Sequence, residues 1–368
     1  MSAKTGTLRL ISGVGAKGPA CFVLETGSRR IMLDLGEGPP PGLLPDIAGL
    51  GPIDALVLSH GHVDHVGGLP LLQKLGNPPI YATAIVARDL PKRFPHQGLD
   101  LRPLPVGGAG EVLGIAVTTG RNGHAPGGVW VHFAIGGGLL YTGDWSTESI
   151  LYAFDPPEQP ADVALVDCSY GTYGRTLGNC WEALAPLVER GPLLLPVPAN
   201  GRGPELALQV LRYGHTDIFV DAAMAQALRH LASTDEASLR AEASDDVKAI
   251  AVAAKPIEEP RGIMLAASAD GTSGATKNLL ERWAHTAEPA IVFTGYRAPD
   301  TPADRLIKNG RAQFLRWNVH PRLSDVIALA EAVRPRTIIP AFCDRTQLPG
   351  LAETLAPARV TMDGPVAL

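Results

Sequence analysis

The sequence contains no run of about 18 consecutive apolar residues, the length that a helix needs to cross a bilayer. Its first segment, residues 1–9, lacks the apolar centre of a secretory signal. The four cysteines form no Cys-x-x-Cys pair, so neither a disulfide framework nor a thiolate zinc site is predicted. These absences exclude a membrane-spanning class and a disulfide-stabilised secreted class, and we expect a cytoplasmic protein that does not bind a membrane.

An excess of positive charge is also missing. The chain has 32 Lys and Arg against 37 Asp and Glu, a formal net charge of −5, which argues against a protein that coats nucleic acid through bulk electrostatics. From Lys277 to Arg322, however, eight basic residues stand against four acidic ones, a local charge of +4. This segment is either a track for a phosphate backbone or an ordinary solvated surface. Its basic residues are Lys277, Arg282, Arg297, Arg305, Lys308, Arg311, Arg316 and Arg322, and its acidic residues are Glu281, Glu288, Asp300 and Asp304.

The chain is long and has enough hydrophobic residues to form a sizeable core. Its 368 residues, 45% of them hydrophobic, predict two domains or one domain with a large insertion. In the first half, short β-rich runs between Gly-rich turns predict strands at 8–11, 20–25, 30–35, 55–59, 129–135 and 139–142. From about Thr172 predicted helices (181–190, 203–213, 221–233, 276–287) alternate with short strands (193–198, 217–220, 262–267, 290–294), which indicates a second α/β layer. Strand, helix and strand follow at 313–317, 323–333 and 336–340.

The loop after the strand at 55–59 reads His60-x-His62-x-Asp64-His65. Imidazole and carboxylate are the ligands that suit zinc, and a tight loop at a strand end can direct four such groups into one small volume. Only ten histidines are spread over the chain, so this density favours a metal site over an exposed polar loop.

Three further residues lie in similar positions. His124 stands in a glycine-bounded turn before a strand, and Asp144 follows the strand at 139–142, where its two oxygens could bridge two ions. Asp34, at the end of the third strand, is placed to orient a ligand histidine through a hydrogen bond. Taken alone, each would be a turn aspartate or a buried histidine.

In this order, Asp34, the His60–His65 motif, His124 and Asp144 resemble the metallo-β-lactamase superfamily, and within it the β-CASP nucleases, such as ribonuclease J and the pre-mRNA 3′-end endonuclease. Later segments resemble β-CASP landmarks in the same order. They are Asp167-Cys168-Ser169-Tyr170-Gly171, the stretch that runs from Asn200 to Leu206, Gly295-Tyr296-Arg297 with Thr301 and Arg305, and His320 in Val319-His320-Pro321.

The resemblance implies a catalytic arrangement. His60, His62 and His124 would hold the primary zinc, and Asp64, His65 and Asp144 would form a partner position bridged by Asp144. Asp64, His320 and Asp167 would be the catalytic residues, with His320 protonating the leaving oxygen while Asp167 supports it; the alternative for His320 is a buried or helix-capping residue. Arg202, Tyr296, Arg297 and Arg305 are the candidate substrate-binding residues.

One departure concerns the second ion. Where ribonuclease members of the family end a segment in a metal-binding histidine, this chain has Phe342. The Artemis-like DNA-processing branch also lacks this histidine and has a small apolar residue instead. Either a second ion binds weakly through Asp64, His65 and Asp144, or Cys343 or Asp344 replaces the missing ligand. We expect the first: one tight Zn²⁺ and a weaker second ion, with Mn²⁺ as the alternative metal.

The resemblance thus implies an α/β protein: a metallo-β-lactamase αββα sandwich (1–171, completed by 312–368) with an inserted β-CASP-like domain (172–311) and the site between them. The function implied is hydrolysis of phosphodiester bonds in RNA or single-stranded DNA by a metal-activated hydroxide. Two alternatives stay open: a catalytically weakened nucleic-acid-binding partner, and a small-molecule ester or thioester hydrolase. RNA against DNA, exo- against endonuclease action and the oligomeric state are not determined by the sequence.

Overall fold

The computed structural model describes residues 5–368, which form two compact units. The sandwich unit contains the described residues up to Thr147 together with Phe154–Gly174 and His320–Leu368. The insert unit contains Glu148–Ala153 and Arg175–Val319. The chain therefore passes from the sandwich unit to the insert unit mainly at Arg175 and returns at His320. The domain division predicted from the sequence, with an insert at 172–311, stays a prediction.

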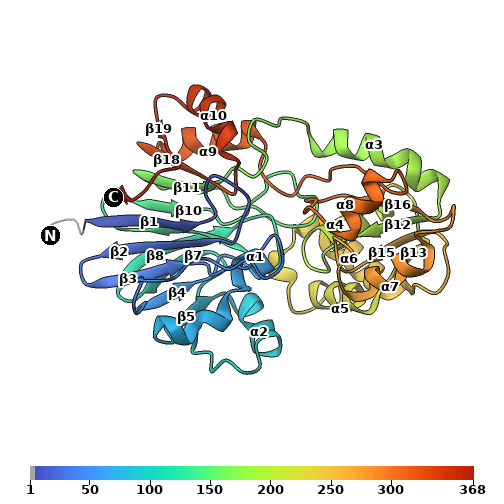
Figure 1. Ribbon diagram of the computed structural model, residues 1–368, viewed down its shortest axis with the longest axis horizontal. Helices are drawn as coiled ribbons and strands as arrows, with labels where there is room; N and C mark the ends of the chain where they lie inside the picture. The colour runs from blue at the N-terminus through green and yellow to red at the C-terminus, as the bar shows by residue number, and fades with distance from the viewer. Residues whose placement is uncertain (1–4) are drawn as a thin grey trace. The chain divides into compact units, whose positions relative to one another are not determined.

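Two seven-stranded sheets form the centre of the sandwich unit (Figure 1). The first has the order β20-β1-β2-β3-β4-β5-β6 and the second the order β19-β18-β11-β10-β9-β8-β7. The strands of the first sheet are β20 (Val366–Ala367), β1 (Gly6–Ser12), β2 (Cys21–Thr26), β3 (Arg29–Leu33), β4 (Ala55–Val57), β5 (Ile80–Ala82) and β6 (Leu101–Pro103). Those of the second are β19 (Arg359–Val360), β18 (Thr337–Ala341), β11 (Val163–Asp167), β10 (Leu139–Tyr141), β9 (Val129–Phe133), β8 (Ile115–Arg121) and β7 (Gly108–Val112).

Alternating side chains divide this unit into four layers. In β2, Phe22 and Leu24 point into an apolar core shared with Val131 and Phe133 of the second sheet, whereas Val23 points to the other face. The outer face of the first sheet is covered by α1 (Val63–Val66), η1 (Leu69–Leu75) and α2 (Ala84–Arg93), and that of the second by α9 (Leu323–Val333) and α10 (Leu348–Thr354), which η4 (Arg345–Gln347) precedes. The predicted αββα sandwich is therefore confirmed.

The insert unit is built on a six-stranded sheet in which every pairing is parallel. Its strands, in spatial order, are β14 (Lys255–Pro256), β13 (Ile218–Val220), β15 (Ile263–Ala266), β12 (Leu193–Pro196), β16 (Ala290–Phe293) and β17 (Gln313–Phe314). Parallel strands buried on both faces need helices on each side. Leu193 and Leu195 face α3–α6, and Leu194 faces α7 and α8. The expected α/β insert is thus present.

The helices of the insert unit are α3 (Leu177–Arg190), α4 (Arg202–Arg212), α5 (Ala222–Leu231), α6 (Ser244–Ala253), α7 (Gly274–Trp283) and α8 (Pro302–Lys308), with short turns η2 (Glu236–Ser238) and η3 (Ala241–Ala243). The four predicted helices correspond to α3, α4, α5 and α7, whereas α6 and α8 were not predicted. Among residues 5–368, no helix combines the length and the apolar character that a bilayer crossing demands.

Candidate metal centre

The candidate ligands lie where neighbouring strands of the sandwich unit end. β3 and β4 run parallel, so Asp34 and the His60 loop, which follow them, lie at the same edge of the first sheet. β10 and β11 are also parallel, which places Asp144 beside Asp167 at one edge of the second sheet. His124 lies in the turn between β8 and β9. The predicted loops are therefore brought together by strand pairing.

The backbone of the metal loop is fixed by close packing. Leu35 donates its N–H to the carbonyl of His65, and Ala20 donates to that of Asp64. A Cβ at Gly36 would lie 1.8 Å from the Asp64 carbonyl oxygen, so only glycine fits there. The turn of α1 then leaves the side chain of Asp64 partly exposed, at 22%, while burying His65.

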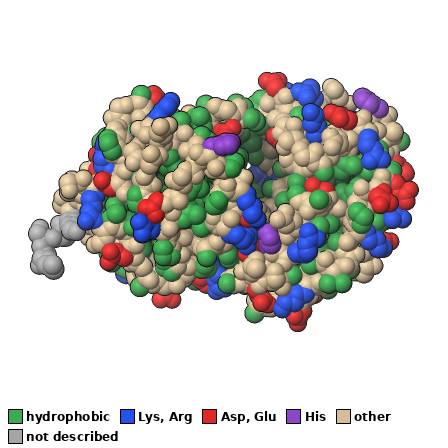
Figure 2. Space-filling view, turned by 90° about the horizontal axis from the view of Figure 1, so that it is seen from below, with side chains coloured by type: hydrophobic (Ala, Val, Ile, Leu, Met, Phe, Trp, Pro, Cys, Tyr) green, Lys and Arg blue, Asp and Glu red, His purple; other side chains and the backbone are tan. Residues whose placement is uncertain are grey.

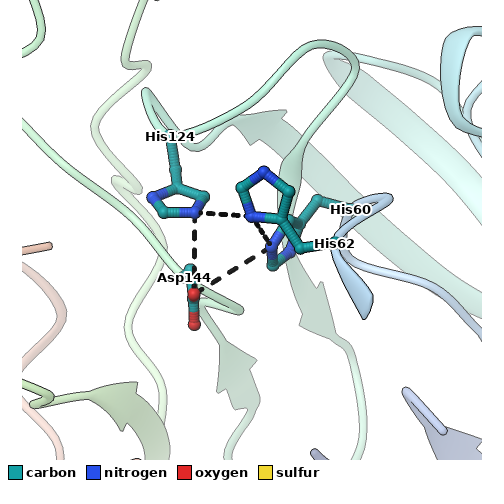
Figure 3. Close-up of side chains that lie close together, drawn as sticks. All are labelled: His60, His62, His124 and Asp144. Carbon is teal, nitrogen blue, oxygen red and sulfur yellow. Dashed lines mark hydrogen bonds and ion pairs between the residues drawn. The ribbon is translucent and has the colours of Figure 1, made fainter. Parts of the chain in front are cut away.

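Three imidazoles and one carboxylate converge on a single point (Figure 3). The Nδ1 of His62 lies 3.1 Å from Nε2 of His60 and 3.0 Å from Nε2 of His124. The Oδ2 of Asp144 lies 3.6 Å from Nε2 of His124 and 4.0 Å from Nε2 of His60. Four ligand atoms around zinc at about 2.0–2.1 Å would be separated by roughly 3.3–3.4 Å, so this arrangement fits a divalent ion.

The protonation of His60 agrees with a ligand role. Burial, with the neighbouring His65 and His62, holds the pKa of His60 well below its ordinary value. A neutral imidazole has the free lone pair that a metal requires.

A second group consists of Asp64, His65 and Asp144. The Nε2 of His65 and Oδ1 of Asp144 lie 3.2 Å apart, and within residues 5–368 neither buried atom has a hydrogen-bond partner. Burial alone would lower the pKa of His65, but the carboxylates of Asp144 and Asp34 outweigh it and raise that pKa well above its ordinary value. In the absence of an ion, therefore, His65 carries the positive charge of this group.

Asp34 orients the centre through hydrogen bonds. Its carboxylate accepts hydrogen bonds from Nδ1 of His65 (2.7 Å), from the backbone N–H (2.7 Å) and hydroxyl (2.6 Å) of Ser59, and from the hydroxyl of Tyr141. Tyr141 belongs to the second sheet, so this contact ties the two sheets together under the ligands. Asp34 has a φ of +55°, a left-handed conformation that directs its side chain inward.

A third group links Asp144 to Asp167 and His320. The Nδ1 of His320 lies 2.7 Å from Oδ2 of Asp167 and 3.7 Å from Oδ2 of Asp144. The ring of Tyr170 packs edge-on against that of His320 at 5.2 Å. Nδ1 of His320 is thus held by a fully buried carboxylate, and Nε2 is the nitrogen left for other contacts.

The candidate substrate-binding residues lie in the insert unit. Arg202 is buried at the start of α4, where its guanidinium packs on Gly295. Tyr296 is 53% exposed. The Nε of Arg297 pairs with Asp304 at 3.3 Å, and a guanidinium nitrogen of Arg305 donates to the carbonyl of Asp300 at 2.6 Å.

Local partners also hold much of the basic segment between Lys277 and Arg322. Lys308 pairs with Asp304 at 2.6 Å, and Arg322 pairs with Asp325 at 2.8 Å. Arg311 donates to backbone carbonyls of Trp283 and Pro289. On the face drawn in Figure 2, Lys and Arg are interspersed with Asp and Glu.

Sequence profiles match both halves of this architecture. The profile of the metallo-β-lactamase superfamily covers residues 14–186, and that of the β-CASP domain covers residues 206–306. The chain therefore carries a metallo-β-lactamase superfamily region followed by a β-CASP domain. The family resemblance of its motifs is therefore confirmed, and a His/Asp cluster suited to a divalent metal is present.

Similar β-CASP proteins are named for RNA processing or transcription. The chain is 31% identical to ribonuclease TTHA0252 of Thermus thermophilus over 56% of either chain. It is 27% identical to the transcription termination factor FttA of Methanosarcina mazei (86% of this chain, 61% of that one) and 27% identical to the endoribonuclease YSH1 of Yarrowia lipolytica (79% and 42%). The chain therefore covers less than two thirds of the length of each of these relatives.

A solved structure shows the same fold over nearly the whole length. It is a protein of unknown function from Enterococcus faecalis V583, with a TM-score of 0.65, 14% identity and 99% coverage of both chains.

Phe342, the departure from the ribonuclease members of the β-CASP family, is buried beside the second group. Its ring centroid lies 5.2 Å from that of His65 and 6.2 Å from that of Phe22. Cys343 belongs to none of the possible metal-binding groups of residues 5–368, and burial raises its pKa to about 12. Asp344 is outside these groups too, and its carboxylate caps η4 through Thr346.

Three residues near this β-CASP site were not predicted. Tyr141 ends a short strand, and its hydroxyl contact with Asp34 joins distant segments. Asn122 accepts a hydrogen bond from the backbone N–H of His124 at 3.0 Å and so shapes the turn that presents this ligand. The Nζ of Lys17 lies 3.9 Å from Oδ2 of Asp64. Asn122 stood two positions before a predicted ligand, whereas Tyr141 and Lys17 carried no local signal.

Proposed function

We propose that the chain is a metal-dependent nuclease that hydrolyses phosphodiester bonds in RNA or single-stranded DNA. The observation that carries this proposal is the convergence of His60, His62, His124 and Asp144 beside the Asp167–His320 pair within the sandwich unit. RNA is the first substrate to test, because similar proteins are named ribonuclease and endoribonuclease. The four cysteines are buried and free, which agrees with a cytoplasmic location.

For the metal we propose zinc. His60, His62 and His124 would hold it with nitrogen atoms that already lie at suitable separations, and Asp144 would complete the set. When bound, the ion would lower the pKa of water and offset charge on the phosphoryl group. Asp34 would keep His65 oriented through its Nδ1.

The proton for the leaving oxygen would come from His320. Asp167 accepts from Nδ1 of this ring, fixing its orientation and leaving Nε2 as the donor. When the phosphorus–oxygen bond breaks, the proton on Nε2 would pass to the departing oxygen, and a water would later restore it.

A direct experiment compares labelled single-stranded RNA and DNA with zinc-loaded protein. We expect cleavage of RNA by the wild type and none by His60→Ala or Asp144→Ala. His285→Ala is the matched control, because His285 is exposed and lies in the insert unit. If neither polymer is cut, or if the two ligand variants cut as well as the control, the nuclease proposal fails.

Phe342 favours one second candidate, a nucleic-acid-binding partner without turnover. Its phenyl ring cannot bind a metal, and it closes one side of the second group. Retained RNA binding by metal-loaded protein, with no product after long incubation, would support this candidate instead.

A further inference from the structure

The loop between β1 and β2 brings a lysine to the second group of candidate ligands. The Nζ of Lys17 lies 3.9 Å from Oδ2 of Asp64, and the two side chains are only 19% and 22% exposed. Lys17 thus contributes a fixed positive charge to a cluster rich in carboxylates.

Phe342 lies against the same loop. Its backbone N–H donates to the carbonyl of Gly13 at 2.7 Å, Val14 forms a bridge with Ala341, and Gly15 forms one with Asp344. The segment that carries the phenyl ring and the loop that carries the ammonium are therefore held together by backbone pairing. Phe342 supplies no ligand to the second group, and Lys17 supplies a cation.

Charge balance connects the two observations. The second group has two carboxylates, Asp64 and Asp144, and the ammonium group of Lys17 lies 3.9 Å from Oδ2 of Asp64. This ammonium group offsets the charge of Asp64 without a second metal ion. A second divalent ion bound through Asp64 would have to approach this ammonium, and like charges a few ångströms apart repel one another.

We propose that Lys17 takes the place of a second metal ion, so that the centre operates with one divalent ion and one ammonium group. The catalytic part of this inference rests on the proposed nuclease function, but the ion count does not. Phe342 and Lys17 then act together. The phenyl ring offers no ligand for a second metal ion, and the ammonium group supplies the positive charge that this ion would have brought.

The test measures metal binding directly. Metal-free wild type, Lys17→Met, Lys17→Arg and the exposed-lysine control Lys74→Met are titrated with zinc, and bound metal per chain is determined by elemental analysis. We expect one tight ion in the wild type, Lys17→Arg and Lys74→Met. In Lys17→Met, we expect the affinity for a second ion to rise by about tenfold or more, because the repelling charge is gone.

Activity is the second measurement. With one equivalent of zinc, Lys17→Met should cleave RNA at least about tenfold more slowly than Lys17→Arg, and excess zinc should restore part of the loss. Two tight ions in the wild type, or an unchanged second-ion affinity in Lys17→Met, would overturn the inference. Thermal melting identifies a variant that does not fold, in which case Lys17→Gln replaces Lys17→Met. A wild type that binds one ion but cuts nothing would defeat the nuclease proposal and leave the ion count standing.

Discussion

Nδ1 of His320 donates a hydrogen bond to Oδ2 of Asp167 across 2.7 Å, although the two residues are 153 positions apart in the chain. The pair also lies within reach of Asp144, so the carboxylate that would touch the metal and the proposed proton donor share one small buried volume. Proton transfer and metal binding can therefore be separated by mutating residues a few ångströms apart.

Asp167→Asn should lower kcat roughly 100-fold, because the ring of His320 loses the charged acceptor that orients it. KM and bound zinc should stay at wild-type values. Asp100→Asn, at an exposed position, is the control for the same chemical change. Steady-state kinetics and elemental analysis check both statements. Loss of zinc from the variant would show that Asp167 is a ligand rather than a positioning residue.

Removal of the metal should lower stability as well as activity. An ion that binds only the folded chain stabilises it by about 2.7 kcal/mol at a free concentration of 100 Kd. We expect a chelator to reduce the melting temperature of the wild type and to have little effect on His60→Ala, which has lost one of the converging ligands. Calorimetry with and without chelator measures the difference. Equal shifts for the two proteins would contradict the proposed role of His60.

Cys343→Ser should leave the number of bound ions unchanged. Burial raises the pKa of this thiol to about 12, so the thiolate that a metal prefers is scarce at neutral pH. The Sγ of Cys343 lies 3.6 Å from the carbonyl oxygen of its neighbour Asp344. A fall in bound zinc, measured by elemental analysis, would instead identify Cys343 as the substitute for the missing histidine.

The Arg121–Asp155 pair should stabilise the sandwich unit at neutral pH and lose this contribution in acid. Hydrogen bonds from Arg121 hold the pKa of Asp155 below its ordinary value. A carboxyl with a depressed folded pKa stabilises the fold above its unfolded pKa, about 3.9, and this contribution disappears as the pH falls through the folded pKa. The two side chains are 34% and 35% exposed, so solvent screens the pair, and Asp155→Asn should cost at most about 1 kcal/mol at pH 7 and less at low pH. Urea denaturation at several pH values measures this change, and a cost that grew toward low pH would contradict it.

Much of the site was predictable because its residues are grouped in short loops. The spacing of His60, His62, Asp64 and His65 identified the main loop, and His124 and Asp144 were found from their positions at strand ends. Such signals are local: each short loop carries histidine or aspartate residues that a turn alone would not require.

Other features depend on contacts that no local pattern encodes. β7 (Gly108–Val112) has two glycines and little β-propensity, so its pairing with β8 determines its structure. Lys17 reaches Asp64 only because the β1–β2 loop folds over the site. Arg202, predicted at the substrate, is buried against Gly295, and a charged side chain at the start of a helix gives no sign of such burial in the sequence.

The hydrogen bond from Tyr141 to Asp34 joins β10 of the second sheet to the residue that follows β3 of the first, and Asp34 also holds Nδ1 of His65. Shear of one sheet across the other would withdraw the tyrosine, loosen Asp34 and let the ring of His65 rotate. The coordination geometry is thus mechanically coupled to the apolar interface between the sheets. Enlarging or shrinking a side chain such as Phe133 in that interface would disturb the ligand field at a distance, even in a protein that still melts cooperatively.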